Sequence, residues 1–241
     1  MKLPIPKFTH GRAIVCAAFF AVTTLALIAK DTSLHYLPDG ALDPVAILPA
    51  PPLMGSPEQA ADMATVVALH GACTTNEAVA AFAEKKFDVF NFASAVGPYF
   101  TAANLPKTTA FFAQVQEDAA RVTDAAKDIW KRPRPFVVDP SLASGKLEKS
   151  FSYPSGHSTE SMVLALVLAD LVPEQKEAIL AHARLMGWHR IQIARHYPTD
   201  IYAGRVFALA IYKELKANPD FQKHAAAAKA ELDAVAQAAK N

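Results

Sequence analysis

This sequence contains few cysteines and few glycines, and its net charge is close to zero. Its 241 residues include two cysteines and nine glycines, and the formal net charge is +1. Cys16 lies in an N-terminal segment that we expect to be removed, so Cys73 would be left alone and no internal disulfide could form. A chain with so little net charge gives no electrostatic reason to expect a nucleic acid polymer as a partner.

Long apolar runs are scarce as well, and residues 13–29 form the main one. Basic residues precede this run and Lys30-Asp31 follows it. That order is typical of a secretory signal, so we predict a signal peptide over residues 1–29, with the cleavage point left open. An uncleaved membrane anchor is the alternative. Because no second run is long enough to span a bilayer, we expect a periplasmic or secreted protein without stable membrane insertion after signal removal.

Sustained alternation of apolar and polar residues, the pattern of β-strands, is also missing. Residues 30–56 are rich in proline and lack a period, and we predict an extended Pro-rich arm there. Helical periodicity begins at Ser56 and continues, so we predict an all-α fold, a single-domain helical bundle over residues 57–241. The expected helices cover residues 57–70, 75–92, 106–127, 158–171, 173–194, 198–215 and 219 onward.

A first cationic segment lies near the end of the third expected helix. Pro133 and Pro135 disfavour helical geometry at Arg132 and Arg134, so this helix should end near Trp130. Lys127 would then lie in the last turn, with Arg134 on an extended segment just beyond it. Two fixed cations of this kind can hold an oxyanion between them. The alternative is a solvated basic helix end that complements the helix dipole.

A second segment, Pro154-Ser155-Gly156-His157-Ser158, combines a tight turn with the start of an apolar helix. Exposed N–H groups at a helix start attract anions, and the glycine lets a ligand approach the backbone. His157 could then donate a proton to a departing group. The alternative is an ordinary helix cap, which would need little besides the serine.

In a third segment, five residues separate Arg190 from His196, and three more separate His196 from Asp200. Pro198 begins a new helix, so His196 should lie at a helix junction. Asp200 is then about one turn away and can accept a hydrogen bond from one imidazole nitrogen. That bond would fix the tautomer and free the other nitrogen for nucleophilic attack. The alternative for an isolated His-Asp pair is a purely structural hydrogen bond.

Together the three segments match a known pattern: Lys-x6-Arg-Pro, then Pro-Ser-Gly-His, then Arg-x5-His-x3-Asp. The chain resembles the superfamily of type 2 phosphatidic acid phosphatases, bacterial acid phosphatases and vanadium haloperoxidases. Within it, the closest resemblance is to the secreted class A non-specific acid phosphatases of bacteria. This resemblance covers nearly the whole mature chain, including Tyr36-Leu37-Pro38 and Glu117-Asp118-Ala119.

The resemblance implies a role for each matching residue. His196 would be the nucleophile that forms a phosphohistidine, Asp200 would orient it, and His157 would protonate the leaving alcohol. The phosphoryl oxygens would be bound by Lys127, Arg134 and Arg190, with help from Ser155 and the Gly156 backbone. The resemblance also implies that no metal or other cofactor is needed.

Two positions depart from the family pattern. His189 stands where the family usually has serine, and Arg195 stands where an aromatic or small residue is common. Arg195 is interpreted either as a solvent-facing charge or as an extra cation that depresses the pKa of His196. Family members also commonly carry a disulfide that this chain cannot form. The remaining histidines lack metal-ligand spacing, so we predict no metal site.

The resemblance predicts a secreted acid phosphatase that hydrolyses phosphomonoesters through a phosphohistidine, with phosphate transfer to other acceptors open. Its partners would be small-molecule phosphomonoesters and inorganic phosphate, and a homodimer is expected from its apolar helices and arm. Two catalytic histidines predict a rate maximum in mildly acidic solution. The alternatives are a vanadate-dependent haloperoxidase, a lipid phosphate phosphatase and a non-catalytic phosphate-binding protein. The natural substrate is left open.

Overall fold

A computed structural model describes residues 34–240, and all regular structure in this part of the chain is helical. The predicted all-α fold is confirmed. The signal peptide predicted over residues 1–29 lies outside the described residues. None of the described helices is both long and apolar enough to cross a bilayer. The α-helices are α1 (Pro44–Ile47), α2 (Pro57–Ala72), α3 (Thr75–Ala83), α4 (Ala93–Val96), α5 (Pro106–Trp130), α6 (Pro135–Val138), α7 (Gly156–Leu171), α8 (Lys176–Gln192), α9 (Pro198–Ala217) and α10 (Pro219–Ala238).

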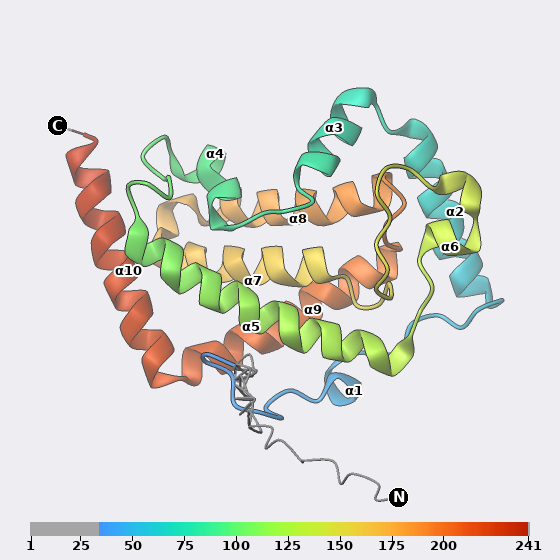
Figure 1. Ribbon diagram of the computed structural model, residues 1–241, viewed down its shortest axis with the longest axis horizontal. Coiled ribbons are helices and arrows are strands. Elements are labelled where there is room, and N and C mark those ends of the chain that lie inside the picture. The colour runs from blue at the N-terminus through green and yellow to red at the C-terminus, as the bar shows by residue number, and fades with distance from the viewer. Residues whose placement is uncertain (1–33, 241) are drawn as a thin grey trace, which may run out of the picture. The chain divides into compact units, whose positions relative to one another are not determined.

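Helix α7 is the central element of the core (Figure 1). Its side chains are apolar nearly all round, and Val163, Leu164 and Leu168 are fully buried. A helix with this composition has to be enclosed by others. It packs against α8, α9 and α5, so the motif at its first turn is held between three long helices.

Helices α7 and α9 approach each other closely at Gly204. A Cβ atom at this position would lie 2.8 Å from the Ser155 carbonyl oxygen and 3.0 Å from the Ser158 Cβ. Only glycine fits such a contact without moving the backbone. The Ser155 N–H also donates to the Asp200 carbonyl at 3.1 Å. The second and third sequence motifs are therefore joined through their backbones.

Helix α5 brings the first motif to the same region. Its buried stripe includes Phe111, Phe112 and Val115, as its amphipathic pattern predicts. At its start, the Glu231 carboxylate of α10 accepts hydrogen bonds from the N–H groups of Lys107 and Thr108. At its end, α5 stops at Trp130 as predicted, which leaves Lys127 in the last turn.

The segment before α2 is anchored to the helices through its backbone. The N–H groups of Tyr36 and Leu37 donate to the buried Asp118 carboxylate of α5 at 2.8 and 3.2 Å. The Tyr153 hydroxyl donates to the Pro49 carbonyl. Residues 34–56 also include the short helix α1, so this segment is not extended throughout.

The helix predicted over residues 75–92 is wrong in its extent. Helix α3 ends at Ala83, and the 3₁₀ helix η1 (Val89–Phe92) precedes α4. Thr74 caps α3, because Thr74 and Glu77 form a reciprocal capping box. Helix α3 stops where the Glu84 carboxylate contacts His189 of α8, so a tertiary contact overrides the local helical pattern.

Smaller differences occur at other helix ends. Helix α7 begins at Gly156 with Ser155 as its cap, two residues before the predicted start. The helix predicted over residues 173–194 is divided into the 3₁₀ helix η3 (Pro173–Gln175) and α8. Beyond α8, Ala194 has a left-handed backbone with φ of 53°, which turns the chain toward His196.

Candidate active site

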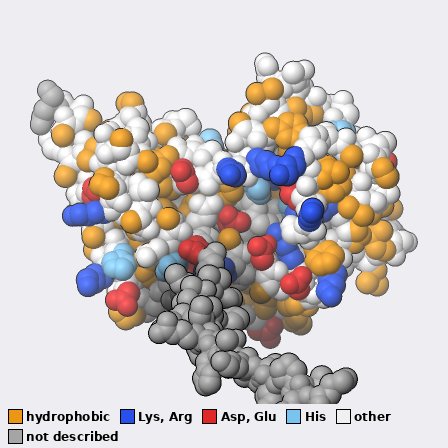
Figure 2. All heavy atoms as spheres, in the orientation of Figure 1, with side chains coloured by type: hydrophobic (Ala, Val, Ile, Leu, Met, Phe, Trp, Pro, Cys, Tyr) orange, Lys and Arg blue, Asp and Glu red, His pale blue; other side chains and the backbone are white. Residues whose placement is uncertain are grey.

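The structure brings the predicted site residues together where α5 ends, α7 begins and α8 leads into α9. One contact between the first and third motifs joins Arg134 Nη1 and His196 Nε2, 3.1 Å apart. Figure 2 shows Lys and Arg side chains beside acidic ones around a hollow near the centre of one face. The predicted residues found in this region are Lys127, Arg134, Ser155, Gly156, His157, Arg190, His196 and Asp200.

The imidazole of His196 is buried and has different partners on its two nitrogens. Its Nδ1 lies 3.4 Å from both the Asp200 carboxylate and the Ser152 hydroxyl, longer than an ideal hydrogen bond. Its Nε2 faces the Arg134 guanidinium, which can only donate, so Nε2 carries the lone pair. Burial and the charges of Arg134 and Arg190 hold the pKa of His196 well below its usual value. The geometry therefore favours a neutral imidazole with its nucleophilic nitrogen beside a cation.

Asp200 belongs to a buried network that the sequence analysis did not predict. Its carboxylate accepts hydrogen bonds from Arg132 Nη1 at 2.6 Å, the Ser152 hydroxyl at 2.5 Å and the Tyr197 N–H at 2.9 Å. Arg132 also binds Asp62 of α2 at 2.7 Å. Burial raises the pKa of Asp200, although these donors oppose that shift. The network fixes the carboxylate that faces His196.

The start of α7 leaves space for an anion. Ser155 caps the helix, and its hydroxyl accepts a hydrogen bond from the Ser158 N–H. A Cβ atom at Gly156 would lie 3.2 Å from Lys127 Nζ, so glycine lets the lysine approach the backbone without shifting. First-turn N–H groups have no acceptor within their own helix, and together with Lys127 they suit a phosphate.

Arg134 is held in place through all of its guanidinium nitrogens. Nε and Nη2 donate to the carbonyl and hydroxyl oxygens of Ser150, at 2.8 and 3.0 Å. Nη1 donates to the Arg195 carbonyl at 2.9 Å as well as facing His196. Burial lowers the pKa of Arg134. A guanidinium fixed in this way can stabilise charge on a phosphoryl group without first reorganising.

Arg190 pairs with Glu148, a residue that the sequence analysis did not single out. The Glu148 carboxylate binds Arg190 Nη2 at 2.7 Å and Arg195 Nε at 2.9 Å. Burial, with Arg134 and Arg195 nearby, lowers the pKa of Arg190 to about 10. Arg195 itself is buried, so its interpretation as a solvent-facing charge is wrong. The cations that depress the pKa of His196 are Arg134, Arg190 and Lys127.

His157 lies at the first turn of α7 and is more accessible than His196. Its Nε2 lies 3.3 Å from the Glu84 carbonyl oxygen, and its ring centre lies 5.3 Å from that of Phe87. Burial and the charges of Arg190 and His196 hold the pKa of His157 well below its usual value. A bound dianion would offset part of this effect, because it favours the protonated form.

Comparison with known proteins identifies the family. Residues 109–218 match the model of the PAP2 superfamily. A non-specific acid phosphatase from Providencia stuartii is 31% identical over 245 residues, covering 96% of this chain and 98% of the relative. An acid phosphatase from Zymomonas mobilis is 32% identical over 203 residues, covering 79% of this chain and 76% of the relative. The chain belongs to the class A non-specific acid phosphatase family.

A third relative in this acid phosphatase family, a non-specific acid phosphatase from Salmonella typhi, is 34% identical over 116 residues, or 46% of each chain. The superfamily match begins within α5 and ends after α9, so it contains all eight predicted site residues. The residues before it, including α3 and Glu84, belong to the part matched by the Providencia stuartii relative.

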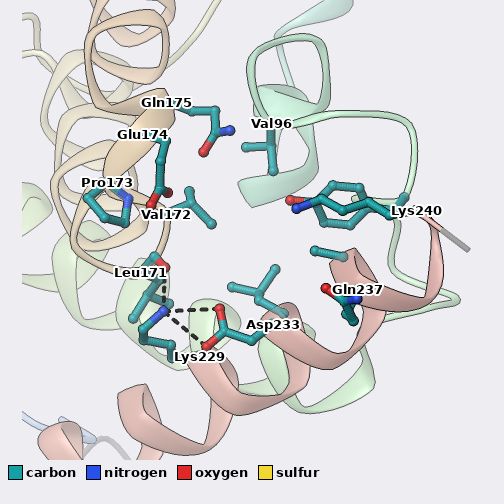
Figure 3. Close-up of a pocket in the computed structure, with 13 residues that line it drawn as sticks. Val96, Leu171, Val172, Pro173, Glu174, Gln175, Lys229, Asp233, Gln237 and Lys240 are labelled. Atoms are coloured by element: carbon teal, nitrogen blue, oxygen red, sulfur yellow. Dashed lines mark hydrogen bonds and ion pairs between the residues drawn. The ribbon is translucent and has the colours of Figure 1, made fainter.

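One cavity of this acid phosphatase family member lies away from the motifs. It measures about 480 Å³ and lies between α10, η3 and the segment that carries Val96 and Tyr99 (Figure 3). Lys229 and Asp233 on its wall already form an ion pair with each other. A cavity of about 290 Å³ borders the motif region, and Lys127 is the predicted site residue among those that line it.

Glu160 is a further site residue that sequence reasoning missed. It lies one helical turn after His157, and a Cβ at Gly156 would lie 3.3 Å from its Oε1. Gln116 Nε2 donates to its Oε2 at 3.1 Å. Burial raises the pKa of Glu160 to about 7. The available signal was a carboxyl group one turn after His157 in a helix with many buried residues. Among residues 34–240, no cluster of three potential metal ligands forms.

Proposed function

We propose that this protein is an acid phosphatase that hydrolyses phosphomonoesters through a phosphohistidine on His196. One observation carries the proposal: His196 is buried and neutral, with Nε2 beside Arg134 and Nδ1 facing Asp200. Relatives matched over most of the chain are named acid phosphatases, which favours this function over the haloperoxidase, lipid phosphatase and phosphate-binding alternatives.

In the first step, the lone pair on His196 Nε2 attacks phosphorus while the bond to the leaving oxygen breaks. His157 gives this oxygen its proton, so an alcohol departs and a phosphohistidine remains. Lys127, Arg134 and Arg190 would neutralise charge on the phosphoryl oxygens, the task that metal ions perform in many phosphoryl-transfer enzymes.

In the second step, water attacks phosphorus and the N–P bond breaks. His157 accepts the proton of the water, inorganic phosphate departs and His196 regains its lone pair. An alcohol in place of water would give phosphate transfer by the same route. The residues that would bind the released phosphate are those that bound the substrate phosphoryl group.

The test is hydrolysis of p-nitrophenyl phosphate by the purified protein, with and without EDTA, beside a His196→Ala variant. We expect the rate to be unchanged by EDTA and to fall at least about a thousandfold in the variant. The matched control is His70→Ala, which removes a histidine bonded to the Gln192 carbonyl, outside the phosphate site. Activity that EDTA abolishes, or that survives the His196→Ala change, would contradict the proposal.

We further propose export to the periplasm or medium, supported by the basic and apolar segments at the start of the sequence. Cell fractionation measures this, and activity confined to the cytoplasm would contradict it. A homodimer remains an expectation from the sequence. Light scattering of the purified protein would distinguish it from a monomer.

A further inference from the structure

A loop formed by residues 84–88, between α3 and η1, packs on the imidazole of His157. Its first residue, Glu84, faces His157 Nε2 with its carbonyl oxygen, at 3.3 Å. Its fourth residue, Phe87, lies against the imidazole with the two rings tilted by 43°. Because a carbonyl oxygen only accepts hydrogen bonds, Nε2 must carry a proton. The proton that His157 exchanges with a substrate is therefore the one on Nδ1.

Glu84 is fixed at its other end by His189. Both side chains are largely buried, and His189 Nδ1 lies 2.9 and 3.0 Å from the two Glu84 carboxylate oxygens. His189 belongs to the last turn of α8 and directly precedes Arg190. A buried hydrogen-bonded pair of this kind gives a defined geometry, because neither partner has water to replace the other.

The far end of the loop has a separate anchor. Gln116 Nε2 of α5 donates to the Phe87 carbonyl at 3.1 Å and to Glu160 Oε2 at 3.1 Å. The loop is thus attached to α8 at Glu84 and to α5 at Phe87. These two attachments leave the loop little freedom to move relative to α7, which carries His157.

We propose that Glu84 and His189 are positioning residues for the general acid His157. This inference rests on the proposed function and deepens it. Glu84 contributes both ends of the connection, since its carboxylate binds His189 and its carbonyl orients His157. His189 occupies the position where the acid phosphatase family usually has serine. The shorter serine side chain would not span the contact that the imidazole makes here.

The experiment compares two substrates that differ in their need for a general acid. p-Nitrophenolate leaves readily without a proton, whereas the alkoxide of glycerol 2-phosphate does not. In His189→Ala we expect kcat/KM for glycerol 2-phosphate to fall about tenfold or more, as part of the 10²–10⁴-fold that general acid catalysis supplies. For p-nitrophenyl phosphate we expect a fall of no more than about threefold.

Companion variants separate positioning from structure. Glu84→Ala should reproduce the substrate-dependent loss, and His157→Ala should show the same pattern with a larger loss. His189→Gln keeps a side-chain N–H donor for Glu84 and should restore at least about half of the lost rate. His70→Ala is the control, and thermal unfolding verifies that each variant is folded.

An equal loss for both substrates in His189→Ala would overturn the inference, because it would indicate a general structural role. No loss for either substrate would also overturn it. Failure of the proposed function would give a different result. The wild-type protein would then hydrolyse neither substrate, or the His196→Ala variant would remain active.

Discussion

The two histidines of the site are held in contrasting ways. His196 is buried at the junction of α8 and α9, and its partners Asp200 and Arg134 are themselves fixed by several hydrogen bonds. His157 is partly accessible, and a carbonyl oxygen of an irregular loop is its hydrogen-bond partner. The first arrangement depends on helices, and the second depends on how one loop is attached to them.

This difference corresponds to the different tasks proposed for the two residues. A nucleophile must meet phosphorus along one line of attack in every substrate, so rigid support is an advantage. A general acid must reach a leaving oxygen whose position changes with the alcohol. Support from a loop can differ between family members without disturbing the nucleophile. Substitutions around His196 and substitutions around His157 should therefore have effects of different size and kind.

The largest effect should come from Asp200→Asn, on the His196 side. The asparagine can turn an N–H toward Nδ1 and hold the wrong tautomer, so kcat for p-nitrophenyl phosphate should fall about 10³–10⁴-fold, as in other enzymes with a histidine–aspartate pair. The comparison variant is Asp62→Asn, which removes a charge beside Arg132 but does not contact His196, so its loss should be smaller. A loss below about tenfold would mean that Asp200 is not needed to orient the nucleophile.

An intermediate effect should appear in the pH dependence, which reports the His157 side. A lowered pKa means that His157 loses its proton at a lower pH than an ordinary histidine. His196 has a lowered pKa too, so it stays neutral in mild acid. The kcat/KM for glycerol 2-phosphate should therefore begin to decline below about pH 6.5 and keep falling as the pH rises, approaching tenfold per unit. A profile that rises above neutrality would contradict this assignment of acid and nucleophile.

The smallest effect should come from Glu148→Gln. Arg190, like Arg134, lowers the pKa of both histidines, so the two sides share it. Glu148 competes with a phosphate dianion for this arginine, and its side chain is 21% exposed. Removing its charge should lower the inhibition constant of inorganic phosphate about fivefold, the effect of a partly screened charge pair. Weaker phosphate inhibition would show that Glu148 positions Arg190 instead. Glu177→Gln, in the first turn of α8, is the control.

The arrangement around His196 could be predicted from the sequence because the residues that determine it are close together in the chain. Pro198 marks the junction and Asp200 follows within one turn, so neighbouring residues give the geometry. The end of α5 near Trp130 was predicted for the same reason, from the prolines that follow. Helix starts with a proline in the first turn were likewise predicted correctly at Pro57 and Pro106.

His157 itself was predicted, but the loop that contacts it was not. The contacts of this loop join residues that lie far apart in the chain. Glu84 lies 73 residues before His157 and 105 residues before His189. Local periodicity continued through Glu84 and favoured helix, whereas the contact with His189 ends it. Arg132 was missed as a structural residue for a similar reason, since its partner Asp62 lies 70 residues earlier. Residue spacing within one segment cannot predict contacts between residues this far apart in the chain.

The close contact of α7 with α9 at Gly204 has a consequence for how such a site can diversify. Main-chain atoms determine how far the first turn of α7 lies from the start of α9. Side chains in the loop of residues 84–88 come from a different part of the chain. Substitutions there can alter the surroundings of the leaving group while the distance between the two helices is conserved. The surroundings of the leaving group and the spacing of the two helices are thus encoded in separate segments, which mutation can explore independently.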